Sequence, residues 1–227
     1  IGSGRDSCII DGNQLSSVIR FEEDLGGIID TTTLITGFTI QNGNYAHLTG
    51  QDYAGGGIYC SDNTSPSISN VIITGNTAGS GGGIYCGNNT ILSDVIIIDN
   101  SAEYTGGGIY TYGGTFTNVS ISGNSAVGSG GGVSINTNNE DNATDPIFNN
   151  VIAYDNTAVF GGGFTIQYSN PTLLNSTIYG NTASGQSNAD GGGIYVGNTV
   201  PIPVLINSIV WNNTPNEIGD PGSNTIV

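Results

Sequence analysis

The chain has 227 residues, of which 38 are Gly and 28 are Asn. Only 9% of the residues are charged, and two Arg against 18 acidic residues leave a formal charge of −16 with no Lys. This balance excludes a protein that binds a nucleic-acid backbone, which needs clustered cations, and it argues against docking on anionic lipid. No apolar run approaches the roughly 18 residues of a membrane-spanning helix, so we expect no membrane insertion by this segment.

Short strand-like segments begin near the N-terminus and lead into an internal repeat. The first two are Cys8-Ile-Ile-Asp-Gly-Asn13 and Ser17-Val-Ile-Arg-Phe21, and a degenerate first copy of the repeat spans residues 37–43. Gly-Gly-Gly then recurs at intervals of 26, 25, 24, 31 and 30 residues. The triplets begin at Gly55, Gly81, Gly106, Gly130, Gly161 and Gly191. Ile-Tyr follows four of the six triplets, so each triplet marks the same point in a repeated unit.

A second block of seven residues follows each triplet. Its first regular copy is Asn70-Val-Ile-Ile-Thr-Gly-Asn76, and apolar residues dominate its second and fourth positions. Apolar residues two apart lie on one face of a strand, whereas interior Gly triplets would destabilise a helix. A further apolar column lies three residues ahead of the block's second position: Ile35, Ile68, Leu92, Phe116, Phe148, Leu173 and Leu205. The pattern predicts short strands with one buried face.

A period of about 24 to 26 residues fits a coil of three short strands and three turns. Stacked coils pair each strand with its own copy one coil along, in parallel and in register, at a spacing of about 4.8 Å. Apolar columns then fill a narrow core, and Asn amides form ladders at the turns. We predict an all-β right-handed parallel β-helix of about seven to eight coils. We expect it to be a single domain over residues 1–227 and a fragment or processed part of a longer chain.

The repeat resembles a known family of sequences. Gly-Gly-Gly-Ile-Tyr-Cys followed by Ser-Pro-Ser-Ile-Ser-Asn-Val-Ile-Ile-Thr-Gly-Asn-Thr-Ala resembles right-handed parallel β-helix repeat proteins of bacteria and archaea. It is also similar to repeats of chlamydial polymorphic outer-membrane proteins, which pair a Gly-Gly-aliphatic unit with an apolar-x-x-Asn unit. The resemblance covers nearly the whole chain and implies a secreted protein, extracellular or displayed on the cell surface. It identifies no activity, because this fold carries adhesins, stalks and lyases alike.

Candidate catalytic and metal-binding groups are few. A polysaccharide lyase needs a strong base, and this chain offers only Arg5 and Arg20. The paired carboxylates that a hydrolase needs occur only at Glu22-Glu23-Asp24 and at Glu140-Asp141 with Asp145, in segments typical of turn insertions. One His and three Cys give no zinc spacing. We expect no catalytic residue, metal site or cofactor, with calcium at the oxygen-rich loop 140–145 left open.

Two cysteines and three sequons are candidate modification sites. Cys60 and Cys86 share an inward column and lie one coil apart, a separation that a disulfide can bridge. Two buried thiols that act as small apolar groups are the other interpretation. Of six Asn-x-Ser/Thr sequons, those at Asn63, Asn88 and Asn142 fall in predicted turns where a glycan can be attached.

Two sets of outward-pointing aromatic residues are candidate binding residues. The Ile-Tyr pairs contribute one column: Tyr59, Tyr85, Tyr110 and Tyr195. Another face carries Tyr154, Tyr179 and Trp211 among aliphatic residues. Exposed apolar strips mark contact surfaces, and aromatic ladders can stack on sugar rings. The alternatives are that long loops cover these rings or that such residues simply favour strands.

We therefore predict a non-catalytic structural or adhesive β-solenoid. Its expected partners are further copies of itself, assembled into filaments, or other surface proteins and glycans, and nucleic acid is not among them. If the sequons are used, the protein is a glycoprotein. A polysaccharide-binding or polysaccharide-cleaving β-helix module is the alternative.

Overall fold

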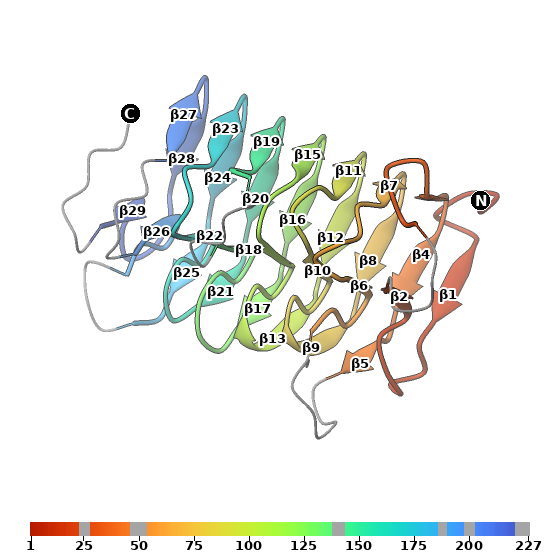
Figure 1. The fold of residues 1–227 in the computed structure, drawn as a ribbon. Coiled ribbons are helices and arrows are strands. Elements are labelled where there is room, and N and C mark those ends of the chain that lie inside the picture. Colours follow the sequence, from red (N-terminus) through yellow and green to blue (C-terminus); the bar gives the residue numbers. More distant parts are fainter. Residues whose placement is uncertain (23–27, 46–53, 138–143, 186–189, 198–202, 221–227) are drawn as a thin grey trace.

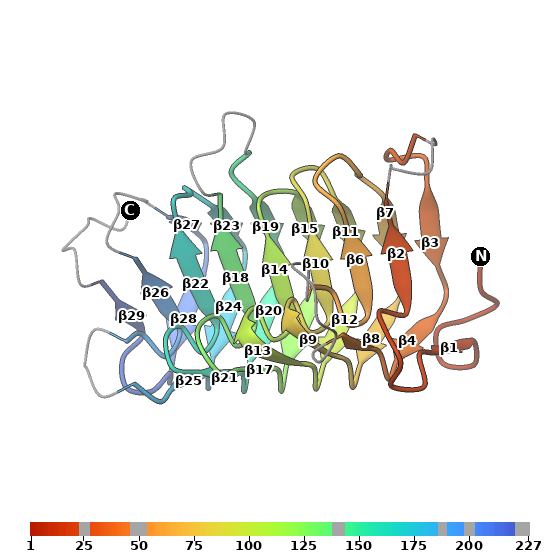
Figure 2. The same ribbon diagram turned by 60° about the horizontal axis from the view of Figure 1, so that its bottom comes forward.

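The computed structural model shows a chain wound into a parallel β-helix (Figures 1 and 2). The structure describes residues 1–22, 28–45, 54–137, 144–185, 190–197 and 203–220. All strand pairs among these residues are parallel, and the strands form four sheets that run along the axis of the coil. The described residues include no helix that is long and apolar enough to cross a membrane. The predicted fold class is confirmed.

Sheets A and B each contain eight strands, one from every coil. In spatial order, the strands of sheet A are β1 (Ile9–Asp11), β4 (Thr39–Gln41), β8 (Ile72–Thr74), β12 (Ile96–Ile98), β16 (Ser120–Ser122), β20 (Ile152–Tyr154), β24 (Thr177–Tyr179) and β28 (Ile209–Trp211). Those of sheet B are β2 (Ile19–Phe21), β6 (Ile58–Cys60), β10 (Ile84–Cys86), β14 (Ile109–Thr111), β18 (Val133–Asn136), β22 (Phe164–Gln167), β26 (Ile194–Val196) and β29 (Ile218–Gly219).

Sheet C has seven strands and sheet D has six. The strands of sheet C are β3 (Leu34–Thr36), β7 (Ser67–Ser69), β11 (Ile91–Ser93), β15 (Thr115–Thr117), β19 (Ile147–Asn149), β23 (Thr172–Leu174) and β27 (Val204–Ile206). Those of sheet D are β5 (Asn44–Tyr45), β9 (Thr77–Ser80), β13 (Ser101–Thr105), β17 (Ser125–Ala126), β21 (Thr157–Ala158) and β25 (Thr182–Ala183).

Sheet D adds a short strand to the three that the repeat length predicts. It arises where a Ser-Ala or Thr-Ala pair follows the last Asn of the block, as in Asn100-Ser-Ala and Asn156-Thr-Ala. The Ala side chains point inward and form a small buried cluster of their own, made of Ala102, Ala126 and Ala158. The same column begins with Tyr45, which is in register with Ala78 on the next strand.

The core consists of columns of like side chains in register. Ile68 pairs with Leu92, Leu92 with Phe116, and Phe116 with Phe148 on neighbouring strands of sheet C. All four are fully buried, and the rings of Phe116 and Phe148 stack with centroids 4.6 Å apart. The predicted apolar columns are thus confirmed, and their burial supplies the main stabilising term.

A second internal column is a ladder of buried asparagines. Nδ2 of Asn100 donates to Oδ1 of Asn124 at 3.0 Å, and Nδ2 of Asn124 donates to Oδ1 of Asn156 at 3.0 Å. Each amide also bonds the backbone, so Asn124 Nδ2 donates to Ile97 O at 3.0 Å. The ladder ends at Asn213, whose backbone N and Nδ2 both donate to Oε2 of Glu217. The Glu217 carboxylate thus accepts hydrogen bonds from the last N–H groups of a row of aligned amides. An acidic residue at a helix N-terminus interacts with aligned amide dipoles in the same way.

The Gly triplets allow both bending and close packing. The first Gly of each triplet has a positive φ, for example 67° at Gly106. The third Gly lies against the neighbouring coil: a Cβ on Gly108 would be 2.7 Å from the carbonyl oxygen of Gly132 and 3.1 Å from Nδ2 of Asn124. A side chain at this point would force the coils apart.

The sixth position of the block alternates strictly between Asx and Gly along the solenoid. All its members have a positive φ. The column reads Asn42, Gly75, Asp99, Gly123, Asp155, Gly180 and Asn212. Asp99 leans onto the next coil, and its Oδ1 lies 2.4 Å from where a Cβ of Gly123 would be. At Gly123 and at Gly180, where the distance to Oδ1 of Asp155 is 2.9 Å, a side chain would therefore have to displace the Asp of the preceding coil, whereas Gly75 would be 3.6 Å from Oδ1 of Asn42 and leaves more room.

Candidate functional site

Three of the predicted tyrosines form a stacked column on the outer face of sheet B. Tyr59, Tyr85 and Tyr110, here called the tyrosine column, lie on adjacent strands in register. Ring centroids are 5.3 Å apart between Tyr59 and Tyr85 and 5.1 Å apart between Tyr85 and Tyr110. At these distances, with interplanar angles of 17° and 3°, the rings face one another along the solenoid axis. Both faces of the Tyr85 ring are therefore occupied by its neighbours.

Tyr112 covers part of the tyrosine column. Its ring packs edge-on against Tyr85 and Tyr110, and its hydroxyl lies 2.7 Å from the hydroxyl of Tyr85. Tyr110 is only 9% exposed. Burial and the contact with Tyr112 raise the pKa of both Tyr85 and Tyr110 above the ordinary value of 10.0. This column is thus largely a packed structural element.

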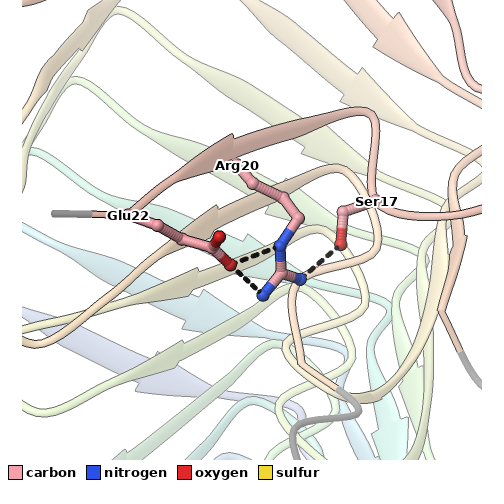
Figure 3. Close-up of polar contacts among 3 residues, drawn as sticks. All are labelled: Ser17, Arg20 and Glu22. Atoms are coloured by element: carbon pink, nitrogen blue, oxygen red, sulfur yellow. Dashed lines mark hydrogen bonds and ion pairs between the residues drawn. The ribbon is translucent and has the colours of Figure 1, made fainter. Parts of the chain in front are cut away.

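Arg20 closes the N-terminal end of the tyrosine column, and Figure 3 shows its contacts with Ser17 and Glu22. Its guanidinium carbon lies 4.0 Å from the ring centroid of Tyr59, a cation–π contact. Nη2 lies 2.5 Å from Oε1 of Glu22, Nε donates to the same oxygen at 2.7 Å, and Nη1 donates to Ser17 Oγ at 3.2 Å. The predicted candidate carboxylate Glu22 is therefore engaged in holding Arg20, while Glu23 and Asp24 lie outside the described residues.

Tyr195 is separated from the tyrosine column by two coils. Ser134 and Thr165 occupy the same register on the intervening strands and are both buried. Tyr195 packs instead against Phe160, with ring centroids 5.3 Å apart. The four predicted tyrosines share one column of the sequence repeat, but the structure brings only three of them together.

The other aromatic set lies on the outer face of sheet A and is more exposed. Tyr154 and Tyr179 are in register and stack with centroids 5.2 Å apart and an interplanar angle of 6°. Trp211 is in register with Tyr179 and is 65% exposed. The sheet A strip, as we name this face, also contains exposed Ile152 and Ile209. The sheet A strip is compatible with the predicted contact role, which stays a prediction.

Cys60 and Cys86 are fully buried free thiols. Burial raises the pKa of the Cys86 thiol from 9.0 to about 12 and also raises that of Cys60. Cys8 is only partly buried, and hydrogen bonds from Ser3 lower its pKa. The disulfide between Cys60 and Cys86 stays a prediction, and both side chains are free thiols in this structure.

Two of the three candidate glycosylation sites lie among the described residues, and they differ in accessibility. Asn63 is exposed in the turn between β6 and β7, whereas Asn88 is partly buried in the equivalent turn one coil along. The Oδ1 atom of Asn88 is buried and without a hydrogen-bond partner. Asn142 lies outside the described residues, as do Glu140 and Asp141 of the predicted oxygen-rich loop. The described part of the chain contains no cluster of three or more His, Cys, Asp or Glu side chains placed to hold a metal ion.

The structure also shows a cleft that the sequence does not predict. It has a volume of about 550 Å³ and lies on the outer face of sheet C. Its floor is Ile91, Thr115 and Ile147, which are in register on three successive strands. Asn88 and Asn89 form one wall, and Thr144 and Asp145 contribute another. A periodic sequence pattern cannot indicate this site, because Thr144 and Asp145 belong to an irregular insertion.

Two segments of the chain match a known repeat. Residues 70–87 and 94–112 match the Chlamydia polymorphic membrane protein repeat. Each matched segment contains one strand of sheet A, one of sheet D and one of sheet B. Comparison with curated proteins and with solved structures found no match. The chain is a parallel β-helix repeat protein whose repeats resemble those of the Chlamydia polymorphic membrane protein.

Proposed function

We propose that the chain is a non-catalytic structural and adhesive solenoid displayed on a cell surface. The observation that carries the proposal is the side of the rod formed by sheet A. From β8 to β28, its outward side chains are Ile, Thr, Ser, Tyr and Trp, with no charged residue. The chain has a formal charge of −16, so a continuous uncharged and partly apolar face is unusual for its surface and is typical of a contact surface.

Two further features support this function. The repeats resemble one named for a membrane protein, which agrees with an envelope location. The in-register core and the Asn ladder make a stiff rod, which suits a spacer that holds a contact face away from the cell. The predicted partners are a second copy of the chain, other surface proteins or glycans.

The location is tested by digesting intact source cells with a protease and following the chain with an antibody. We expect the protein to disappear from intact cells while a cytoplasmic marker survives. Persistence of the protein until the cells are lysed would contradict surface display.

The structural role is tested with purified protein by electron microscopy and by incubation with acidic and neutral polysaccharides. We expect rods or laterally associated filaments and no shortening of the polysaccharides. The substitution Trp211→Ser, at an exposed position of the sheet A strip, should reduce lateral association, and Leu15→Ser, at a similarly exposed apolar residue elsewhere, should not. Cleavage of a polysaccharide would favour the alternative enzyme function.

A further inference from the structure

The cleft on sheet C combines an aliphatic floor with polar walls. Two of its floor residues are Ile, and Ile147 is 43% exposed. Around them stand amide, hydroxyl and carboxylate groups from Asn88, Asn89, Thr115 and Asp145. The volume of about 550 Å³ lies within the range of small-molecule sites, which is roughly 300–1,000 Å³.

Several polar groups of the cleft are held in place by the fold. Asn170 N donates to Oδ1 of Asp145 at 2.6 Å, and Ser169 Oγ donates to the same atom at 3.1 Å. Thr144 Oγ1 donates to the carbonyl oxygen of Asn88 at 3.0 Å and thereby ties the two walls together. These bonds fix the walls before a ligand arrives, which lowers the entropy cost of binding.

Other polar groups are left for a ligand. The side chains of Asn89 and Thr115 are exposed and form no hydrogen bond with the described part of the chain. An amide and a hydroxyl can each donate and accept. They therefore match a ligand that itself carries many hydroxyl groups.

The charges around the cleft exclude anionic ligands. Arg20 lies on sheet B, and Arg5 donates to the carbonyl oxygen of Asp94, so neither cation of the chain lines the cleft. Asp145 and the formal charge of −16 repel phosphates, nucleotides and uronic acids. A wholly apolar ligand would leave the polar walls without partners.

We propose that the cleft binds a neutral saccharide, with the aliphatic faces of separate pyranose rings on Ile91 and on Ile147 and hydroxyls directed to Asn89, Thr115 and Asp145. The in-register floor runs along the solenoid axis, so an oligosaccharide lies across successive coils. The saccharide site is argued from the cleft alone, and only its use in adhesion rests on the proposed function.

The test is titration calorimetry on protein from a host that does not glycosylate, because a glycan on Asn88 would occupy the cleft. The probes are trisaccharides of glucose, mannose and N-acetylglucosamine, and the anionic control is a trisaccharide of galacturonic acid. We expect binding of at least one neutral probe and none of the anionic one.

Three variants locate the binding. Thr115→Val removes the hydroxyl but keeps a β-branched side chain in the strand, and it should weaken binding about fivefold, as expected for one lost hydrogen bond. Thr172→Val makes the same change in the same column but outside the cleft, and it should leave the affinity unchanged. Asn89→Ala, in an exposed turn, provides a second loss-of-binding variant that should not affect folding.

The proposal is overturned if no neutral probe binds, if the galacturonate binds as tightly, or if the two Thr variants behave alike. These results leave the surface location untouched, since that is measured on intact cells. Conversely, saccharide binding by a protein that proves to lie inside the cell would retain the site and refute surface display.

Discussion

At the scale of single residues, burial determines the chemistry of the three thiols. Cys60 and Cys86 sit in a core column whose other members include Ile135, Ile166 and Val196, so the fold treats them as small apolar side chains. Cys8 is partly accessible and has a lowered pKa. Because the thiolate is the reactive form, the three residues should differ strongly in reactivity.

We expect a maleimide at neutral pH to label Cys8 rapidly in the folded protein and to leave Cys60 and Cys86 unlabelled. Mass spectrometry after labelling measures this directly. Unfolding without a reductant should then expose two further thiols if both cysteines are free. Labelling of Cys8 alone in the unfolded chain would show the disulfide instead.

At the scale of elements, neighbouring coils share columns of like side chains in the core, and one turn column alternates between Asx and Gly. Sequence periodicity revealed the apolar core columns, such as Ile68, Leu92 and Phe116, because an apolar residue recurs at the same point of each repeat. It also indicated the Asn ladder. It did not show that ring faces are hidden in the tyrosine column, because that depends on ring orientation between coils. It did not indicate the cleft, because Thr144 and Asp145 of one wall belong to an insertion that does not follow the repeat.

The buried Asn ladder should be sensitive to truncation of any single member. Asn124→Ala removes the acceptor of Asn100 N and Nδ2 and the donor to Ile97 O. We expect a loss of about 2–4 kcal/mol in the free energy of unfolding, because several buried groups lose partners together. Denaturant unfolding measures it. Asn118→Gly, in an exposed position with φ of 55°, serves as the control and should cost less than about 1 kcal/mol. Equal losses would contradict the special role of the ladder.

The alternation of Asx and Gly predicts a coupled pair. Gly123→Asn keeps a residue type that tolerates positive φ, but its Cβ would meet Oδ1 of Asp99. We expect it to destabilise the protein by about 1–3 kcal/mol, and we expect Asp99→Gly in the same chain to recover much of that loss. A double-mutant cycle measured by denaturant unfolding gives the coupling. Additive effects would show that the two positions do not compete for space.

At the scale of the whole molecule, the same buried groups govern the response to alkali. The pKa of Cys86 is raised from 9.0 to about 12, and those of Cys60, Tyr85 and Tyr110 are raised as well. The unfolded chain therefore loses these protons at lower pH than the folded chain. Since the unfolded state then binds fewer protons, stability falls as pH rises.

We expect the free energy of unfolding to be steady below about pH 9 and to decline from there towards about pH 12. Guanidinium unfolding at a series of pH values tests this. A variant with both Cys60→Val and Cys86→Val should show a shallower decline, because it lacks two of the groups whose pKa is raised. Val fits this column, since Val196 occupies it in a later coil. An unchanged slope in the variant would assign the effect to the tyrosines alone.

The alternating column also restricts how such a rod can change length. Removing the single coil that carries Gly123 would bring Asp99 and Asp155 onto adjacent coils, where their two carboxylates would lie close together and repel each other. Removing two consecutive coils keeps the alternation of Asx and Gly in this column. At this point of the rod, removal of two consecutive coils is therefore expected to cost less stability than removal of one.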